Sequence, residues 1–77
     1  MEFTKFQINE YRAKALSIVA EVVQSRIDCC RSSIESYKQQ LEDNPENDYL
    51  HGWIQGEVEE KFIWEACMEL LEKKLAK

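Results

Sequence analysis

The stretch EDNPEND at positions 42–48 separates two long segments in which apolar residues recur every three or four positions. Proline disfavours helical backbone at the preceding residue, so a helix should end before Pro45. Asn44 can then cap a second helix that has Pro45 at its first position, where the missing N–H costs nothing. With 77 residues the chain is long enough for one domain.

These signals predict an all-α fold, an antiparallel two-helix hairpin that fills residues 1–77. The expected boundaries are a first helix over about 5–42, a loop over about 43–46 and a second helix over about 46–75. Thr4 and Gln7 have the spacing of a capping box at the start of the first helix. In this hairpin Tyr37 should face Gly52, and Cys67 should lie near Val22.

The first segment carries a coiled-coil heptad pattern in which steps of three and four residues alternate. A half-buried β-strand would need strict alternation instead. The pattern therefore predicts one helix face that packs against the second helix. Its positions are Phe6, Asn9, Ala13, Leu16, Ala20, Val23, Ile27, Cys30, Ile34, Tyr37 and Leu41.

Both segments widen their apolar face near the termini, where each gains a second stripe. On the first helix this stripe is Ile8, Tyr11, Ala15, Ile18 and Val22. On the second helix it is Trp64, Met68, Leu71 and Leu75, beside Phe62, Ile63, Cys67 and Leu70. Two helices can cover only one stripe each, and a large apolar patch left in water marks an interaction site.

We therefore predict that the second stripes mediate self-association, with two hairpins forming an antiparallel, homodimeric four-helix bundle. Burying one large apolar side chain is worth roughly 1.5 to 3 kcal/mol, which gives the driving force. The competing interpretation is that a different protein covers the same surface.

The net charge of −5 falls in the second half of the chain. Residues 1–42 hold six acidic and six basic side chains, whereas residues 43–77 hold nine acidic and four basic ones. An acidic surface repels phosphate backbones, which argues against a nucleic-acid partner. Binding of nucleic acid by the first helix, through Arg12, Arg26 and Arg31, is a weaker alternative, because acidic residues on the same helix balance those bases.

The residues that could carry chemistry do not form a known catalytic pattern. The chain has one histidine, and its three cysteines show no Cys-x-x-Cys spacing. Cys30 and Cys67 lie on apolar stripes and are interpreted as small buried apolar residues. Asp48 and His51 are interpreted as a helix-capping acid and an exposed imidazole. The sequence predicts a protein that is not an enzyme and that needs no metal or cofactor.

The N-terminal segment is too polar for a signal peptide, and no apolar run approaches the length of a membrane span. An odd number of cysteines at irregular spacing is not a disulfide framework, and it fits a compartment that keeps thiols reduced. The expected location is therefore the cytoplasm, with no membrane partner.

A second candidate surface lies close to the loop. Tyr49 and Trp53 are four residues apart, and aromatic side chains ringed by charge are typical of protein-binding hot spots. We predict a partner-binding patch of Tyr49, Trp53, Glu57 and Glu60. The alternative is that Trp53 packs over Gly52 and Gly56 and fills the gap they leave. The glycines themselves could reflect close approach to the first helix or a ragged helix start.

The stretch HGWIQGEVE at 51–59, followed by Phe62, Ile63 and Trp64, resembles a run in small helical proteins of phages and prophages. The resemblance covers about 15 residues and implies a class of short accessory proteins that bind and modulate host or phage machinery. It adds a regulatory protein-binding module, such as an inhibitor of a host protein, to the possible functions. The alternative is a structural subunit or small chaperone that uses the wide apolar face itself.

Overall fold

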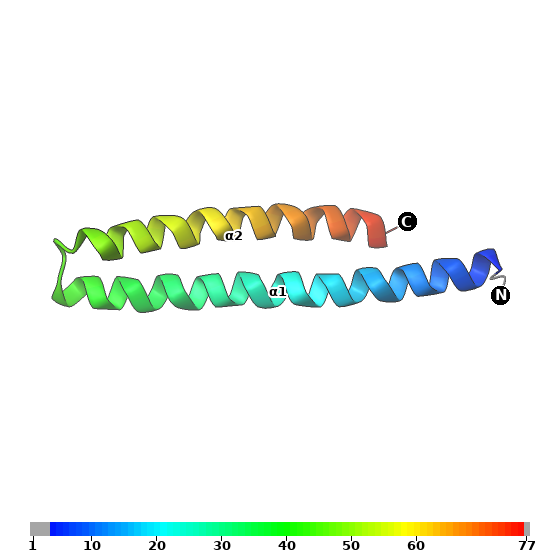
Figure 1. Ribbon diagram of the computed structural model, residues 1–77, viewed down its shortest axis with the longest axis horizontal. Coiled ribbons are helices and arrows are strands. Elements are labelled where there is room, and N and C mark those ends of the chain that lie inside the picture. The colour runs from blue at the N-terminus through cyan, green and yellow to red at the C-terminus, as the bar shows by residue number, and fades with distance from the viewer. Residues whose placement is uncertain (1–3, 77) are drawn as a thin grey trace.

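The computed structural model describes residues 4–76 and shows two long antiparallel helices joined by a short loop (Figure 1). Helix α1 spans Lys5–Asp43 and helix α2 spans Asp48–Leu75. The molecule measures 61 × 17 × 17 Å, and α1 continues beyond the C-terminal end of α2 (Figure 1). The predicted all-α helical hairpin is confirmed. Among residues 4–76, neither helix is long and apolar enough to cross a membrane.

The first helix begins with the capping box that the sequence indicates. The hydroxyl of Thr4 accepts a hydrogen bond from the backbone N–H of Gln7 at 3.2 Å. The side-chain oxygen of Gln7 accepts one from the backbone N–H of Thr4 at 3.0 Å. Two N–H groups that the helix itself cannot pair are thereby satisfied, which fixes the start of α1.

The second helix starts two residues later than predicted, and the prediction that Asn44 caps it is wrong. The cap is Asn47, whose side-chain oxygen accepts from the N–H groups of Tyr49 and Leu50 at 3.0 and 3.3 Å. Asn44 instead ends α1, and its carbonyl accepts from the N–H of Asn47 at 3.1 Å. Pro45 thus occupies the second position of a tight turn, where its fixed φ is equally favourable.

The core lies in the middle and loop-proximal parts of the hairpin. Its buried residues are Val23, Ile27, Cys30, Ile34 and Leu50. The four that belong to α1 are consecutive positions of the predicted heptad pattern, which confirms the inward face of this helix. Burial decreases toward the N-terminus, where Phe6 is exposed because α1 extends past its partner helix (Figure 1). Because so few side chains are buried, the core gives the hairpin limited stability.

The inward face of α2 differs from the prediction. Trp64, Met68 and Leu71, which the sequence assigns to the outer stripe, are half-buried. Phe62, Ile63 and Leu70 are exposed instead.

The inner stripe of α2 runs in phase from Leu50 and Ile54 through Glu57 and Lys61, all buried or half-buried, to Trp64. Two charged residues interrupt this stripe. Because the prediction followed apolar residues alone, it shifted the C-terminal half of the inner stripe by one position. Residues of the inner stripe were thereby assigned to the outer stripe.

The two glycines of α2 are not sites where the helices approach closely, so the explanation of these residues by close approach to α1 is wrong. A Cβ atom added at Gly52 or Gly56 would have no heavy atom of another segment within 4 Å. Both residues are exposed, although Tyr37 does lie beside Gly52 as the predicted register requires. The glycines therefore weaken α2 without any packing benefit inside the hairpin.

Replacing both glycines by alanine, Gly52→Ala with Gly56→Ala, should stabilise the hairpin by up to about 1 kcal/mol per site, because alanine loses less backbone entropy in a helix. Urea unfolding followed by circular dichroism measures the change. The matched control is Ala66→Gly at another exposed position of α2, which should destabilise by a similar amount. A loss of stability in the double alanine variant would contradict this reading of the two sites.

Candidate interaction surfaces

An apolar groove runs between the two helices in the terminal half of the hairpin. Its volume is about 550 Å³. We call it the terminal groove. It is lined by Leu16, Val19 and Val23 of α1, by Trp64, Cys67, Leu70 and Leu71 of α2, and by Arg12 and Lys74. The indole N–H of Trp64 is buried and has no hydrogen-bond acceptor among residues 4–76.

Exposed apolar side chains extend the terminal groove onto both helices. On α1, Ile18 is 62% exposed and Val22 is 55% exposed. On α2, Ile63 is 63% exposed and Leu70 is 62% exposed. The other members of the predicted α1 stripe, Ile8, Tyr11 and Ala15, are exposed as well. We refer to the terminal groove with these residues as the apolar face.

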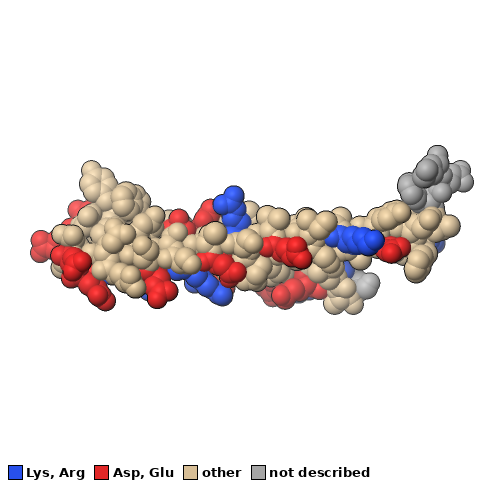
Figure 2. Space-filling model, turned by 90° about the horizontal axis from the view of Figure 1, so that it is seen from below, with Lys and Arg blue, Asp and Glu red and all other residues tan. Residues whose placement is uncertain are grey.

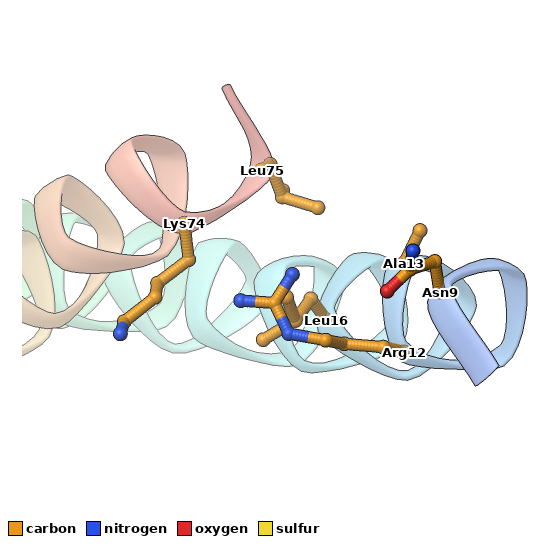
Figure 3. Close-up of a pocket in the computed structure, with 6 residues that line it drawn as sticks. All are labelled: Asn9, Arg12, Ala13, Leu16, Lys74 and Leu75. Atoms are coloured by element: carbon orange, nitrogen blue, oxygen red, sulfur yellow. The ribbon is translucent and has the colours of Figure 1, made fainter. Parts of the chain in front are cut away.

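Positive charge marks the open end of the terminal groove. Figure 3 shows Lys74 pointing from α2 toward α1, and Arg12 lying along α1 with its guanidinium group in front of Leu16. Leu75 lies at the very end of α2, near Ala13 and Asn9 of α1 (Figure 3). Leu75 belongs to the predicted self-association stripe and is 39% exposed.

The opposite side of the hairpin is polar at the same level. The shallow hollow there is lined by Gln24, Ile27, Arg31, Glu65, Met68, Glu69 and Glu72. Arg31 and Glu65 form an ion pair between the helices, with 3.9 Å between nitrogen and oxygen. The terminal half is thus apolar on one side and charged on the other, so a partner can cover the apolar side alone.

Aromatic rings gather at the loop end. The ring of Trp53 lies 5.6 Å from that of Tyr37 and 6.3 Å from that of Tyr49, measured between centroids. Tyr49 is 76% exposed and Trp53 is 53% exposed. Trp53 also lines a shallow pocket of about 310 Å³ with Tyr37, both glycines and Glu57. Trp53 therefore flanks the glycines while about half of its surface stays exposed to solvent.

Acidic side chains gather around the same end, at the left in Figure 2. Four of them lie in or next to the loop, namely Glu42, Asp43, Glu46 and Asp48. The imidazole of His51 lies 2.9 Å from the carbonyl oxygen of Pro45, and Asp48 is in the first turn of α2. His51 is exposed as interpreted, but the cap of α2 is Asn47, so Asp48 is not the capping residue and instead places a negative charge in the first turn.

Glu57, which is half-buried, and Glu60, which is exposed, also lie close to Cys30 of α1. The Cys30 thiol is 1% exposed and donates a hydrogen bond to a carboxylate oxygen of Glu60 at 3.0 Å. Ligand atoms of Cys30, Glu57 and Glu60 all lie within 4.8 Å of one another. Cys30 is buried as predicted, but its two carboxylate neighbours are not evident from the sequence.

This thiol–carboxylate cluster is the one group of three potential metal ligands within residues 4–76. Thiolate and carboxylate together could hold a divalent ion such as zinc, which accepts sulfur and oxygen donors. Binding would first require the thiol to lose its proton, and the site opposes that. Burial, followed by the carboxylates of Glu60 and Glu57, raises the pKa of Cys30 from 9.0 to about 12. As it stands, the cluster is a hydrogen-bonded core contact.

The raised pKa of Cys30 predicts a loss of stability in alkaline solution. The unfolded thiol ionises above about pH 9, whereas the folded thiol stays neutral until about pH 12. Below pH 9 the contribution is complete, and between these values the free energy of unfolding should fall by up to about 1.4 kcal/mol per pH unit. Chemical unfolding across this range measures the slope. Cys30→Ala lacks the thiol, so its profile should be flatter, and identical profiles would contradict the prediction.

The other two cysteines have different surroundings. Cys29 is exposed on α1, and Cys67 is half-buried in the terminal groove beside Val19 and Val23. The position of Cys67 agrees with the predicted register, which placed it near Val22. Its partial exposure differs from the fully buried apolar role expected for it.

Comparison with known proteins does not indicate a function, so a function has to be inferred from the geometry. No protein-family model, curated protein or solved structure matches this chain.

Proposed function

We propose that this chain is a non-enzymatic protein-binding module that works by helix-to-helix association. The observation that carries the proposal is the apolar face, where Ile18, Val22, Ile63 and Leu70 are each more than half exposed. Exposed apolar surface of this extent marks a site of association. The shape supports a helical partner, because an open groove between two parallel cylinders accepts ridges of side chains from another helix.

Self-association is the simplest form of this function. A second copy offers the same apolar face, so one contact covers both surfaces and gives a four-helix bundle. A structural subunit or small chaperone would use the same face for another protein. The resemblance to phage accessory proteins favours a regulatory role in which the bundle presents further surfaces to a host or phage protein.

Charge favours a protein partner over nucleic acid. Residues 43–77 are strongly acidic, and the loop end carries a cluster of carboxylates (Figure 2). Of the α1 bases considered for nucleic acid, Arg31 is paired with Glu65 and Arg12 lines the terminal groove. A phosphate backbone would therefore meet repulsion over much of α2.

Sedimentation equilibrium on Leu70→Glu tests the proposal. A carboxylate in the middle of the apolar face should shift association to at least about tenfold higher concentration, because an unpaired charge is costly to bury. Gln39→Glu adds the same charge at an exposed loop-half position and should associate like the wild type. Equal association of the two variants would mean that the apolar face is not the contact surface.

A second binding surface is favoured by the exposed rings of Tyr49 and Trp53 at the loop end. This aromatic patch lies far from the terminal groove along the hairpin, so it stays accessible when the apolar face is covered. Its acidic surroundings favour a partner with a basic surface and an aromatic or aliphatic anchor.

Affinity capture with Trp53→Ala examines this surface. The variant should lose the captured protein while keeping the helical circular dichroism of the wild type. The matched control is Phe62→Ala, which removes an aromatic ring outside the patch that is more than half exposed, as Trp53 is, and should retain capture. Retained capture by Trp53→Ala would remove the aromatic patch from consideration.

A further inference from the structure

We propose that the occupant of the apolar face is a second copy of this chain in an antiparallel arrangement, with the two-fold axis passing close to Val22 and Cys67. This inference rests on the proposed self-association and adds its geometry. In this arrangement α1 packs on the partner's α1, α2 packs on the partner's α2, and the two loops lie at opposite ends.

Charge on α2 gives the first argument. Glu60, Cys67 and Lys74 follow one another at intervals of seven residues, so they lie on one side of the helix about 10 Å apart. If a second α2 lies antiparallel to the first and is centred on Cys67, Glu60 of each copy lies opposite Lys74 of the other. Glu60 is exposed and accepts from Cys30 through one oxygen, so its other oxygen can meet the ammonium of the other copy, twice in the dimer.

Side-chain size on α1 gives an independent argument with the same centre. The exposed stripe Ile8, Tyr11, Ala15, Ile18 and Val22 continues, in the same steps of three and four, through Arg26, Cys29, Ser33 and Ser36. The stripe is therefore large near the N-terminus and small near the loop.

Reversal about Val22 places the two large residues nearest the N-terminus against the two serines nearest the loop. Ile8 falls opposite Ser36, and Tyr11 falls opposite Ser33. Ala15 falls opposite Cys29, and the stem of Arg26 can cover Ile18. Large-to-small complementarity of this kind lets two helices approach closely without voids.

The two proposed centres agree within the hairpin itself, since Cys67 lines the same terminal groove as Val19 and Val23, the neighbours of Val22 on α1. The same axis also covers the part of α1 that extends beyond α2 (Figure 1), because this segment comes to lie on the loop half of the partner's α1.

A parallel arrangement, with both loops at one end, lacks these features. It would bring Arg12 and Lys74 of both copies together at the open end of the terminal groove. It would also place the acidic loop ends side by side (Figure 2). Like charges in contact disfavour that dimer.

Thiol cross-linking distinguishes the two arrangements. In Cys29→Ser, the accessible thiol is Cys67, because Cys30 is buried and has its pKa raised to about 12. A short bifunctional maleimide should convert most of this protein to a covalent dimer linked through Cys67. Adding Cys67→Ser with Lys74→Cys moves the thiol seven residues from the axis. The two thiols would then lie about 20 Å apart, and cross-linking should fall at least tenfold.

The Lys74→Cys thiol should instead link to a Glu60→Cys thiol when the two variants, both in the Cys29→Ser and Cys67→Ser background, are mixed. Strong cross-linking of Lys74→Cys with itself would overturn the antiparallel arrangement. A dimeric mass without any Cys67 cross-link would overturn the position of the axis. Sedimentation of each variant separates these results from a monomeric mass, which would overturn the proposed self-association as well.

Discussion

Ile27→Ala is expected to lower the free energy of unfolding by about 2 to 5 kcal/mol, the range for removing a large buried aliphatic side chain. Ile27 is one of five buried apolar residues among residues 4–76, and it lies in the middle of the α1 inner face. Because a two-helix core contributes little stability, this variant should unfold at low denaturant concentration or lose its cooperative unfolding transition.

The matched control is Ile18→Ala, which removes the same atoms from the same helix at an exposed position. In dilute protein it should cost far less than Ile27→Ala, because the lost methyl groups already contact water. At concentrations where the apolar face is covered, its cost should rise. Urea unfolding at two protein concentrations measures both effects, and equal costs for the two variants in dilute solution would contradict the assigned inner face of α1.

Val22→Glu is expected to weaken self-association by at least about a hundredfold, because burying two facing carboxylates costs several kcal/mol. Val22 lies at the proposed two-fold axis, so each substitution faces its own copy. The hairpin itself should remain folded, since this side chain is 55% exposed in the single chain.

Thermal unfolding at several protein concentrations measures the effect. Association stabilises the folded form by mass action, so the melting temperature of the wild type should rise with concentration. The melting temperature of Val22→Glu should not change over the same range. A concentration-dependent melting temperature in Val22→Glu would show that residue 22 lies outside the contact.

The sequence predicted the parts of the fold that depend on local chemistry. The Thr4–Gln7 capping box and the inward face from Val23 to Ile34 follow from residue type and spacing, and both are present. The cap of α2 was misplaced because Pro45 suits both the first turn of a helix and the second position of a tight turn. The hydrogen bonds of Asn47 decide between them.

The outer surface of α2 could not be predicted from apolar spacing alone. Glu57 and Lys61 occupy inward positions, which hides the phase of the stripe that ends in Trp64, Met68 and Leu71. A stricter rule, continuing the steps of three and four from Leu50 and Ile54 through charged residues, would have given the correct face. The environment of the Cys30 thiol needed the three-dimensional register, because its partners come from the other helix.

Small-angle X-ray scattering tests most directly whether association covers the apolar face. At about ten micromolar and above, a range typical of modest homodimer affinities, the particle should have twice the chain mass of 9.1 kDa. An antiparallel dimer centred near Val22 should be thicker than the single hairpin while keeping a length close to 61 Å. A particle of 9.1 kDa with a radius of gyration close to the 18.2 Å of the single hairpin would contradict it.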